Sequence, residues 1–200
     1  NFTTATSSYN TAVGALAGAS VTTATFNTLI GGLSGDALTV GNKNTTLGYN
    51  TLSSDTKGDR NVAIGTDALA SQNFTTSTDS YNTAVGMNAG TSVTTGNQNT
   101  LIGGLAGDAL TDSDLNVAVG FQALTSDTLG QYSTAIGYGT LLSQNLTTAT
   151  NTYNTAVGFS AGLSVTTATR DTLVGALAGD ALTTGSFNVA VGYTSLGATT

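Results

Sequence analysis

The 200-residue chain contains no proline, cysteine, histidine or tryptophan, and its eleven acidic residues are all aspartate. Without cysteine and histidine, the sequence excludes disulfide bonds, a Ser-His-Asp triad, a Cys-His dyad and a zinc site. Only 8% of the residues are charged, and the formal net charge is −7. We therefore expect no binding to nucleic acid or to an anionic membrane surface. No apolar run approaches the ~20 residues that cross a bilayer, so no membrane insertion of this segment is expected.

One short phrase, an aliphatic residue followed by glycine, returns eleven times along the chain. Its glycines are Gly14, Gly31, Gly48, Gly65, Gly86, Gly103, Gly120, Gly137, Gly158, Gly175 and Gly192. The phrase has a 17-residue period, and a longer 21-residue interval follows every three short ones, so that four units make a 72-residue super-unit. So short a fixed period predicts a stacked array of coils and not a globule with one central core.

We expect residues 1–200 to form one continuous repeat array with super-units 1–72, 73–144 and a partial 145–200. The chain starts in the middle of the pattern, because residues 1–6 match residues 73–78 and residues 145–150. It is therefore expected to be a window of a longer fibrous chain.

The residues before each glycine are mostly β-branched or small, which favours a short strand. A second short strand is predicted three to eight residues after the glycine, as in residues 17–22. The expected fold class is all-β: a parallel β-solenoid, or β-roll, of 17-residue coils with a 21-residue coil at every fourth position. The Val, Ile or Leu before each glycine is expected to fill a thin interior, with small residues opposite. The Asn that lies four residues before most glycines is expected in a turn, where stacked side chains can form a ladder.

The extra residues of the long coils are polar and are expected to emerge as surface loops at residues 73–80, 145–152 and 1–8. Three Asn-x-Ser/Thr sequons lie in these loops, and a fourth lies in a short coil. They make Asn1, Asn44, Asn73 and Asn145 candidate glycosylation sites. O-linked sugars on the Ser and Thr residues of the loops are a comparable alternative.

Aspartate is the remaining chemistry-bearing residue, and the sequence predicts no catalytic, cofactor or metal site. Asp36 recurs in the later super-units at Asp108 and Asp180, and Asp55 recurs at Asp127. Copies four coils apart are too distant for a pair of glycosidase carboxylates, which lie ~5–10 Å apart. We therefore expect isolated, solvated turn residues and no enzyme. The Tyr and Phe residues are expected in flank packing or subunit contacts, with sugar-stacking platforms as the alternative.

The segments 61–65, 116–120 and 188–192, with sequences Asn-Val-Ala-Ile-Gly and Asn-Val-Ala-Val-Gly, resemble the Ser-Val-Ala-Ile-Gly repeat of YadA-like trimeric autotransporter adhesin heads. The Asn-Thr-Ala-Val-Gly variant, as in residues 154–158, is similar to repeats of phage tail-fibre proteins. The resemblance implies a left-handed parallel β-roll that assembles as a homotrimer, with adhesion or host recognition as its role. The 17-residue unit and the periodic 21-residue coil depart from the adhesin pattern.

A trimer is also expected from the strands themselves, since neighbours such as Leu29 and Ile30 make both strand faces apolar, and a second copy could cover the outer one. The function expected first is a structural and adhesive fibre, a surface adhesin or phage tail fibre that is extracellular, at a cell surface or on a virion. Its partners would be further copies of itself and a cell-surface glycan or receptor. The alternatives are a subunit of a self-polymerising extracellular filament or sheath, and a carbohydrate-binding or depolymerising solenoid.

Overall fold

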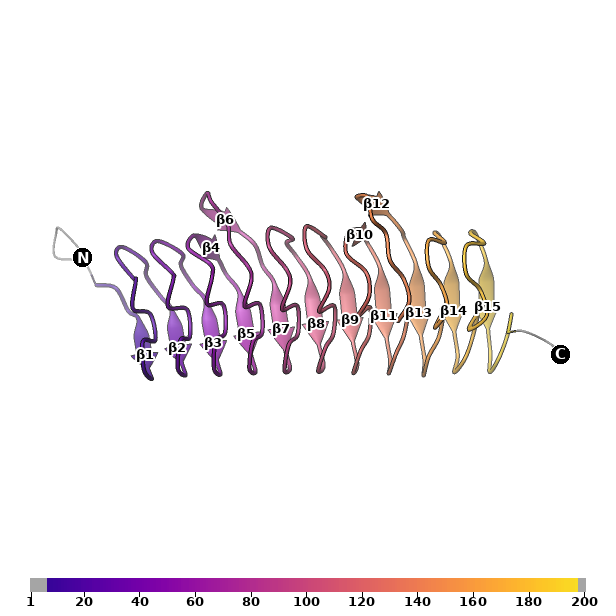
Figure 1. Ribbon diagram of the computed structural model, residues 1–200, viewed down its shortest axis with the longest axis horizontal. Coiled ribbons are helices and arrows are strands. Elements are labelled where there is room, and N and C mark those ends of the chain that lie inside the picture. The colour runs from indigo at the N-terminus through magenta and orange to yellow at the C-terminus, as the bar shows by residue number, and fades with distance from the viewer. Residues whose placement is uncertain (1–6, 198–200) are drawn as a thin grey trace.

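A computed structural model describes residues 7–197, and this part of the chain is a parallel β-solenoid built from strands and turns (Figure 1). One strand from each coil joins an eleven-stranded parallel sheet that follows the rod. These strands are β1 (Thr11–Val13), β2 (Thr28–Ile30), β3 (Thr45–Leu47), β5 (Val62–Ile64), β7 (Thr83–Val85), β8 (Thr100–Ile102), β9 (Val117–Val119), β11 (Thr134–Ile136), β13 (Thr155–Val157), β14 (Thr172–Val174) and β15 (Val189–Val191).

The strand register follows the sequence repeat. Thr11 pairs with Thr28, the equivalent residue of the next 17-residue unit. Val62 pairs with Thr83, so the 21-residue coil keeps the same register and places its extra residues outside the main sheet. The predicted fold class and the 17-residue spacing of the coils are confirmed.

The glycine after each strand is required by the close approach of neighbouring coils. Gly14 has a φ of 134°, and a Cβ at this position would come within 2.5 Å of the carbonyl oxygen of Gly31. Gly175 meets Gly192 in the same way, also at 2.5 Å. A left-handed residue in contact with backbone leaves no room for a side chain, which explains why glycine fills this position in every coil.

The prediction that the residue before the glycine fills the interior was wrong. In β2, Leu29 in the middle of the strand is fully buried, whereas Ile30 beside the glycine is only half-buried. Because successive strand residues point to opposite faces, the Val, Ile and Leu residues before the glycines lie on the outer face. Leu47, in an inner strand, is 48% exposed there. The interior receives the middle residue of each strand, which is Ala, Leu or Thr.

The second predicted strand is also wrong, because residues 17–22 form turns. The segment after each glycine has left-handed residues at alternate positions, such as Leu16 with a φ of 60° and Gly18 with a φ of 62°. Extended β geometry needs negative φ throughout. The turn is nevertheless bonded to the next coil, since Gly18 N donates to Ser34 O at 3.0 Å.

Large and small residues fill the narrow core in complementary positions. Where the middle strand residue is Leu29, the fourth residue after the glycine is Gly35, and a Cβ there would lie 2.9 Å from Leu29 Cδ2. Where the strand residue is Ala63, the turn position carries Leu69, and both are fully buried. Each coil thus has no more than one leucine at these two facing positions, because a close-packed core has room for only one large side chain there.

The predicted asparagine ladder is present, and it lies inside the solenoid. Asn44 is buried: its Oδ1 accepts from the backbone N of Asn61 at 2.8 Å, and its Nδ2 donates to Gly58 O at 2.9 Å. Asn27 makes the same two bonds, to Asn44 N and to Gly41 O. The side chain therefore satisfies one backbone donor and one backbone acceptor at each step of the stack.

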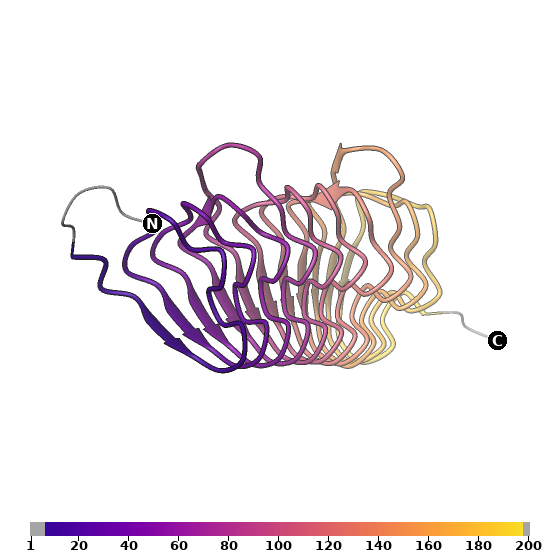
Figure 2. The same cartoon turned by 60° about the vertical axis from the view of Figure 1, so that its left-hand side comes forward.

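The long coils project as two loops from one side of the rod (Figure 2). Each loop carries a two-residue strand that pairs with the coil before it: β4 (Gly58–Asp59) with β6 (Thr78–Asp79), and β10 (Gly130–Gln131) with β12 (Thr150–Asn151). The polar insertions at 73–80 and 145–152 are thus surface loops, as expected. The third predicted loop, at 1–8, lies largely outside the described residues.

A buried polar network anchors each loop at its base. Gln72 Nε2 donates to Asp55 Oδ2 at 2.7 Å, and Gln72 Oε1 accepts from Asn82 Nδ2 at 2.8 Å. Asp55 Oδ1 also accepts from the backbone N of Phe74 at 3.2 Å, where the loop begins. Asp127 and Gln144 repeat the arrangement at 2.6 Å. Asp55 and Asp127 are fully buried, so their prediction as solvated turn residues was wrong.

Candidate functional site: the outer face of the sheet

Two columns of side chains cover the outer face of the eleven-stranded sheet, and we call them together the sheet face. The Thr column lies three residues before each glycine: Thr11, Thr28, Thr45, Val62, Thr83, Thr100, Val117, Thr134, Thr155, Thr172 and Val189. The Val column lies one residue before each glycine: Val13, Ile30, Leu47, Ile64, Val85, Ile102, Val119, Ile136, Val157, Val174 and Val191. In-register pairing repeats these side chains at the ~4.8 Å spacing of parallel strands.

Two further exposed columns flank the strands. The upstream edge column lies five residues before each glycine: Tyr9, Phe26, Lys43, Arg60, Tyr81, Gln98, Leu115, Tyr132, Tyr153, Arg170 and Phe187. The downstream edge column lies one residue after it: Ala15, Gly32, Tyr49, Thr66, Met87, Gly104, Phe121, Tyr138, Phe159, Ala176 and Tyr193. Within residues 7–197, every exposed large apolar side chain except Leu16 and Leu196 belongs to the sheet face or to an edge column.

Aromatic rings stack along both edge columns. Tyr138 lies between Phe121 and Phe159, with ring centroids 5.7 Å and 5.3 Å away. In the upstream column, Tyr132 stacks on Tyr153 at 5.2 Å, and the guanidinium of Arg170 lies 5.8 Å from the Tyr153 ring. The rings are half-exposed, and a ladder of stacked rings offers a large contact area while losing little conformational entropy on binding. They suit recognition of another surface.

The upstream edge column has a left-handed backbone in every coil, including φ of 61° at Phe26 and 64° at Arg60. Non-glycine residues adopt this geometry at a cost. The backbone on either side of this corner is held in place: Phe26 N donates to Ser8 O, and the next residue, Asn27, belongs to the ladder. The corner turns this column outward and the Asn column inward.

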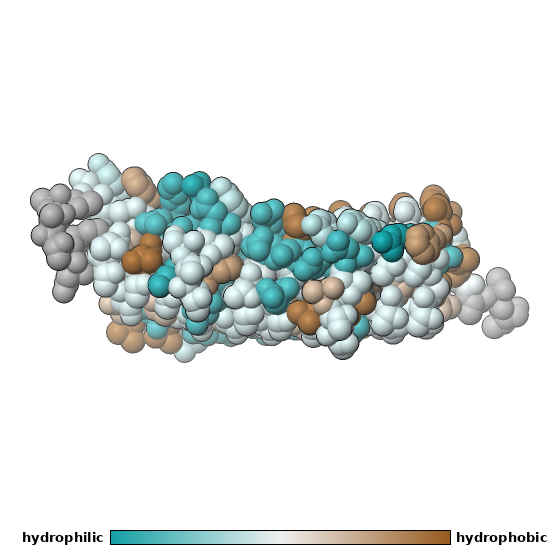
Figure 3. All heavy atoms as spheres, turned by 90° about the horizontal axis from the view of Figure 1, so that it is seen from above, coloured by the Kyte–Doolittle hydropathy of each residue, from teal (hydrophilic) through white to brown (hydrophobic). Residues whose placement is uncertain are grey.

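The side of the rod from which the loops project, beyond the N-terminal ends of the strands, is more polar in character (Figure 2 and Figure 3). Hydrophilic residues gather along its middle, and apolar residues form separate patches (Figure 3). Asn73 and Asn145 lie exposed at the bases of the loops. Asn44 is fully buried with both amide atoms bonded in the ladder, so it is removed from the candidate glycosylation sites. The fourth candidate, Asn1, lies outside the described residues.

The remaining recurrent acids do not assemble into a site. Asp36, Asp108 and Asp180 lie in separate coils, four coils apart, and Asp108 accepts from Thr125 Oγ1 of the next coil. No cluster of potential metal ligands occurs within residues 7–197. Burial raises the pKa of Asp55, against the lowering effect of its bonds to Gln72 and to three backbone N–H groups. Burial likewise raises the pKa of Asp114.

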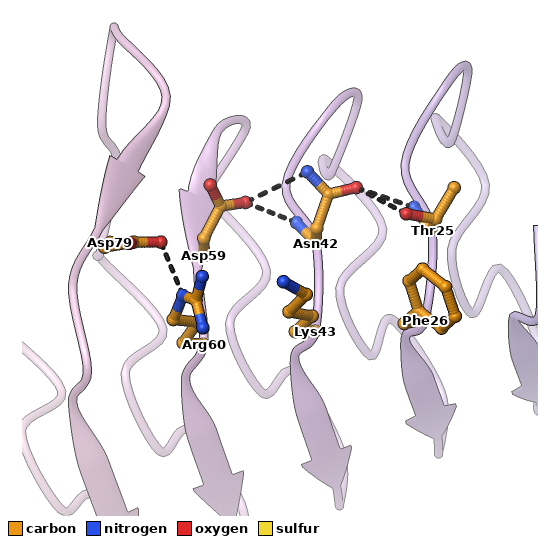
Figure 4. A pocket seen from close by; sticks show the side chains of 7 residues that line it. All are labelled: Thr25, Phe26, Asn42, Lys43, Asp59, Arg60 and Asp79. Carbon is orange, nitrogen blue, oxygen red and sulfur yellow. Dashed lines mark hydrogen bonds and ion pairs between the residues drawn. The ribbon is translucent and has the colours of Figure 1, made fainter.

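One hollow of about 250 Å³ opens beside the first loop, where the upstream edge column carries cations (Figure 4). It is lined by Thr25, Phe26, Asn42, Lys43, Asp59, Arg60 and Asp79. Arg60 Nε donates to Asp79 Oδ1 at 2.6 Å, and this bond raises the pKa of the guanidinium. The clustering of cations at residues 43–60 is visible in the sequence, but the hollow is not, because Asp79 reaches it only through the pairing of β6 with β4.

No protein-family model matches the chain, and neither the curated proteins nor the solved structures include a significant match. No helix that could span a bilayer is found in the range 7–197. The site is therefore interpreted from its own chemistry. Its main feature is a regular surface of one threonine-rich and one aliphatic column, repeated with the period of the coils and bordered by aromatic ladders.

Proposed function

We propose that this chain is a structural, non-catalytic segment of an extracellular fibre, a surface adhesin or phage tail fibre, in which copies associate through the sheet face. A homotrimer is the proposed assembly. The observation that carries the proposal is the exposure of the Val column within the inner strands of the sheet, which includes Leu47 at 48%, Ile136 at 39% and Ile102 at 38%. Contiguous apolar surface of this kind marks an interaction site.

The period of the face favours a second copy of the same chain as its partner. The side chains repeat with each coil along the whole sheet, so a partner must match that repeat to bury all of them. Another copy has the same rise per coil, and the aliphatic Val column on the outer face would be covered by it, as the apolar faces of parallel sheets normally are. A closed cyclic assembly would bury the face in every copy.

A rod of stacked coils suits a fibre because each coil contacts only its neighbours, so length grows without a larger core. The loops at 73–80 and 145–152 project from one side and display exposed Asn73, Asn145 and several Ser and Thr residues. We propose that these loops and the edge columns provide the adhesive contacts, with a cell-surface glycan or receptor as the partner.

The test is the mass of the 200-residue chain in solution, by light scattering and analytical ultracentrifugation, for two matched variants. Ile102, 38% exposed in the Val column, is changed to Asp. Thr76, exposed in the loop, is changed to Asp as the control with the same added charge. We expect a trimeric mass for the unchanged protein and for Thr76→Asp, and a monomer for Ile102→Asp.

Two outcomes would overturn the proposal. A monomer at micromolar concentration for the unchanged protein would mean that copies do not cover the sheet face. Open-ended filaments in electron micrographs, insensitive to Ile102→Asp, would favour the self-polymerising alternative. Circular dichroism of both variants establishes whether the solenoid is intact.

A further inference from the structure

The hollow beside the first loop has spare hydrogen-bond donors and few spare acceptors. Lys43 Nζ has no hydrogen-bond or ion-pair partner within residues 7–197, and Arg60 uses only Nε, in its bond to Asp79. The acceptors are largely occupied: Asp59 Oδ1 accepts from Asn42, and Asp59 Oδ2 accepts from Ser77 Oγ at 2.9 Å. The side chains thus leave an ammonium and the terminal guanidinium nitrogens for a ligand that supplies acceptors.

The row of side chains around these cations fixes their positions. In Figure 4, Phe26, Lys43 and Arg60 follow one another along three successive coils, beneath the row of Thr25, Asn42 and Asp59. Phe26 is 53% exposed and stacks on Tyr9 at a centroid distance of 5.2 Å, which holds its ring in place. Arg60 is held by Asp79 from the loop and lies 5.4 Å from the Tyr81 ring.

We infer that this hollow binds an acidic sugar, a pyranose that carries a carboxylate, with the inference resting on the proposed adhesive function. The carboxylate accepts from Lys43 and from the terminal nitrogens of Arg60, since charge-assisted bonds to carboxylates are the strongest available to these groups. The apolar C–H face of the ring packs against Phe26. Asp79 Oδ2, which has no partner in the described part of the chain, accepts from a sugar hydroxyl.

The side chains of the hollow are not repeated in the next super-unit, which argues against a general property of the repeat. The equivalent residues one super-unit later are Gln98 for Phe26, Leu115 for Lys43 and Tyr132 for Arg60. Three of the four cations of the chain lie between residues 43 and 60, although the net charge is −7. The local chemistry therefore departs from that of the equivalent coils one super-unit later.

The test is calorimetric titration of the 200-residue chain with sodium glucuronate, glucose and sodium acetate as probes. Lys43→Gln removes the free ammonium, and Arg170→Gln is the matched control, a cation of the same column away from the hollow. We expect glucuronate to bind and Lys43→Gln to weaken it at least tenfold, with no change for Arg170→Gln. Phe26→Ala should weaken glucuronate severalfold and leave acetate unchanged.

The other outcomes overturn the inference. If glucose or acetate bound as tightly as glucuronate, the hollow would not require a carboxylate and a sugar ring in the same ligand. If glucuronate did not bind at all, the hollow would not be a site for an acidic sugar. Equal loss in Arg170→Gln would indicate general charge attraction. The mass of each variant, measured in parallel, separates this result from the association of copies, since a monomer that binds glucuronate keeps the site and loses only the fibre assembly.

Discussion

Gly107 lies directly against Leu101, and a Cβ at Gly107 would come within 2.8 Å of Leu101 Cδ2. The pair shows how the thin core is filled, because Leu101 in the strand occupies the space that a side chain from the turn fills in the next coil. There the strand carries Ala118 and the turn carries Leu124, both fully buried. Strand and turn positions are therefore coupled by volume.

We expect the two positions to compensate in a double-mutant cycle. Leu101→Ala should lower the free energy of unfolding by about 2–5 kcal/mol through the cavity that it leaves. Gly107→Leu alone should cost about 1–3 kcal/mol by overpacking. The double variant removes the contact with Leu101 and keeps that with Leu110 Cδ1, which is also 2.8 Å away, so its loss should be smaller than the sum by about 1–3 kcal/mol.

Urea denaturation of the four proteins measures this coupling. Strict additivity of the two losses would show that the cavity and the added leucine do not share one space. As a distant control, Leu29→Ala combined with Gly107→Leu should be additive, because Leu29 lies against Gly35 in another super-unit.

The Asn column carries an acid at one step of the ladder, Asp171. Its Oδ1 accepts from the N and Nδ2 of Asn188 at 2.8 Å and 3.0 Å, but its buried Oδ2 has no hydrogen-bond partner among residues 7–197. In other coils an Asn Nδ2 occupies this place and donates to the carbonyl fourteen residues on, as Asn154 does to Ala168 O. Asp171→Asn should therefore stabilise the protein by about 1–3 kcal/mol.

The melting temperature measures this gain, and a chain of this size should shift by about 2–4 °C per kcal/mol. Asp112→Asn is the control, because it removes the same charge at an exposed residue and keeps an oxygen for Thr95 Oγ1. An equal rise for both variants would attribute the effect to net charge instead of to the ladder.

A regular step of the ladder should be costly to remove. Asn99 Oδ1 accepts from Asn116 N at 3.0 Å, and its Nδ2 donates to Ser113 O at 2.7 Å. Asn99→Ala leaves both buried backbone groups unpaired, so we expect a loss of more than about 2 kcal/mol. Asn97→Ala, two residues away and outside the ladder, should change stability by less than about 0.5 kcal/mol. Equal urea midpoints for the two variants would contradict a structural role of the ladder.

The periodic features of this fold could be predicted from the sequence, because each depends on residues that recur in register. The coil length, the parallel stacking, the glycine contacts and the Asn ladder all follow from columns that the spacing defines. The face of the strand could not be predicted in this way. A three-residue strand such as Thr28–Ile30 offers too little alternation, and its two apolar residues, Leu29 and Ile30, face opposite sides.

The buried acids were missed for a different reason, although a signal was present. The seventh residue after the glycine is Val21, Leu38, Val93 or Leu110 in neighbouring coils, which marks an interior column. Asp55 belongs to the same column, so its burial could have been inferred from register. Its partner Gln72 belongs to that column too. By contrast, the hollow at Lys43 depends on how the loop folds back, and no repeating position in the sequence predicts the conformation of the loop.

The burial of Asp55 predicts a pH dependence of stability with a definite sign. Burial raises the pKa of this carboxyl in the folded protein above its ordinary value of 3.8, which the unfolded chain retains. Between the two values the folded state binds more protons than the unfolded state, so stability falls as the pH rises. The contribution is fully present below 3.8 and is lost as the pH rises through the raised pKa.

Comparison with Asp55→Asn isolates this contribution, because an amide does not titrate. We expect the unfolding free energy of the unchanged protein, relative to that of the variant, to increase as the pH falls from 7 towards 4. Urea midpoints for both proteins across this range measure the difference. A difference that stays constant with pH would mean that the bonds from Gln72, Gly58 and Phe74 to Asp55 offset the effect of burial, and that the carboxyl titrates alike in the folded and unfolded chains.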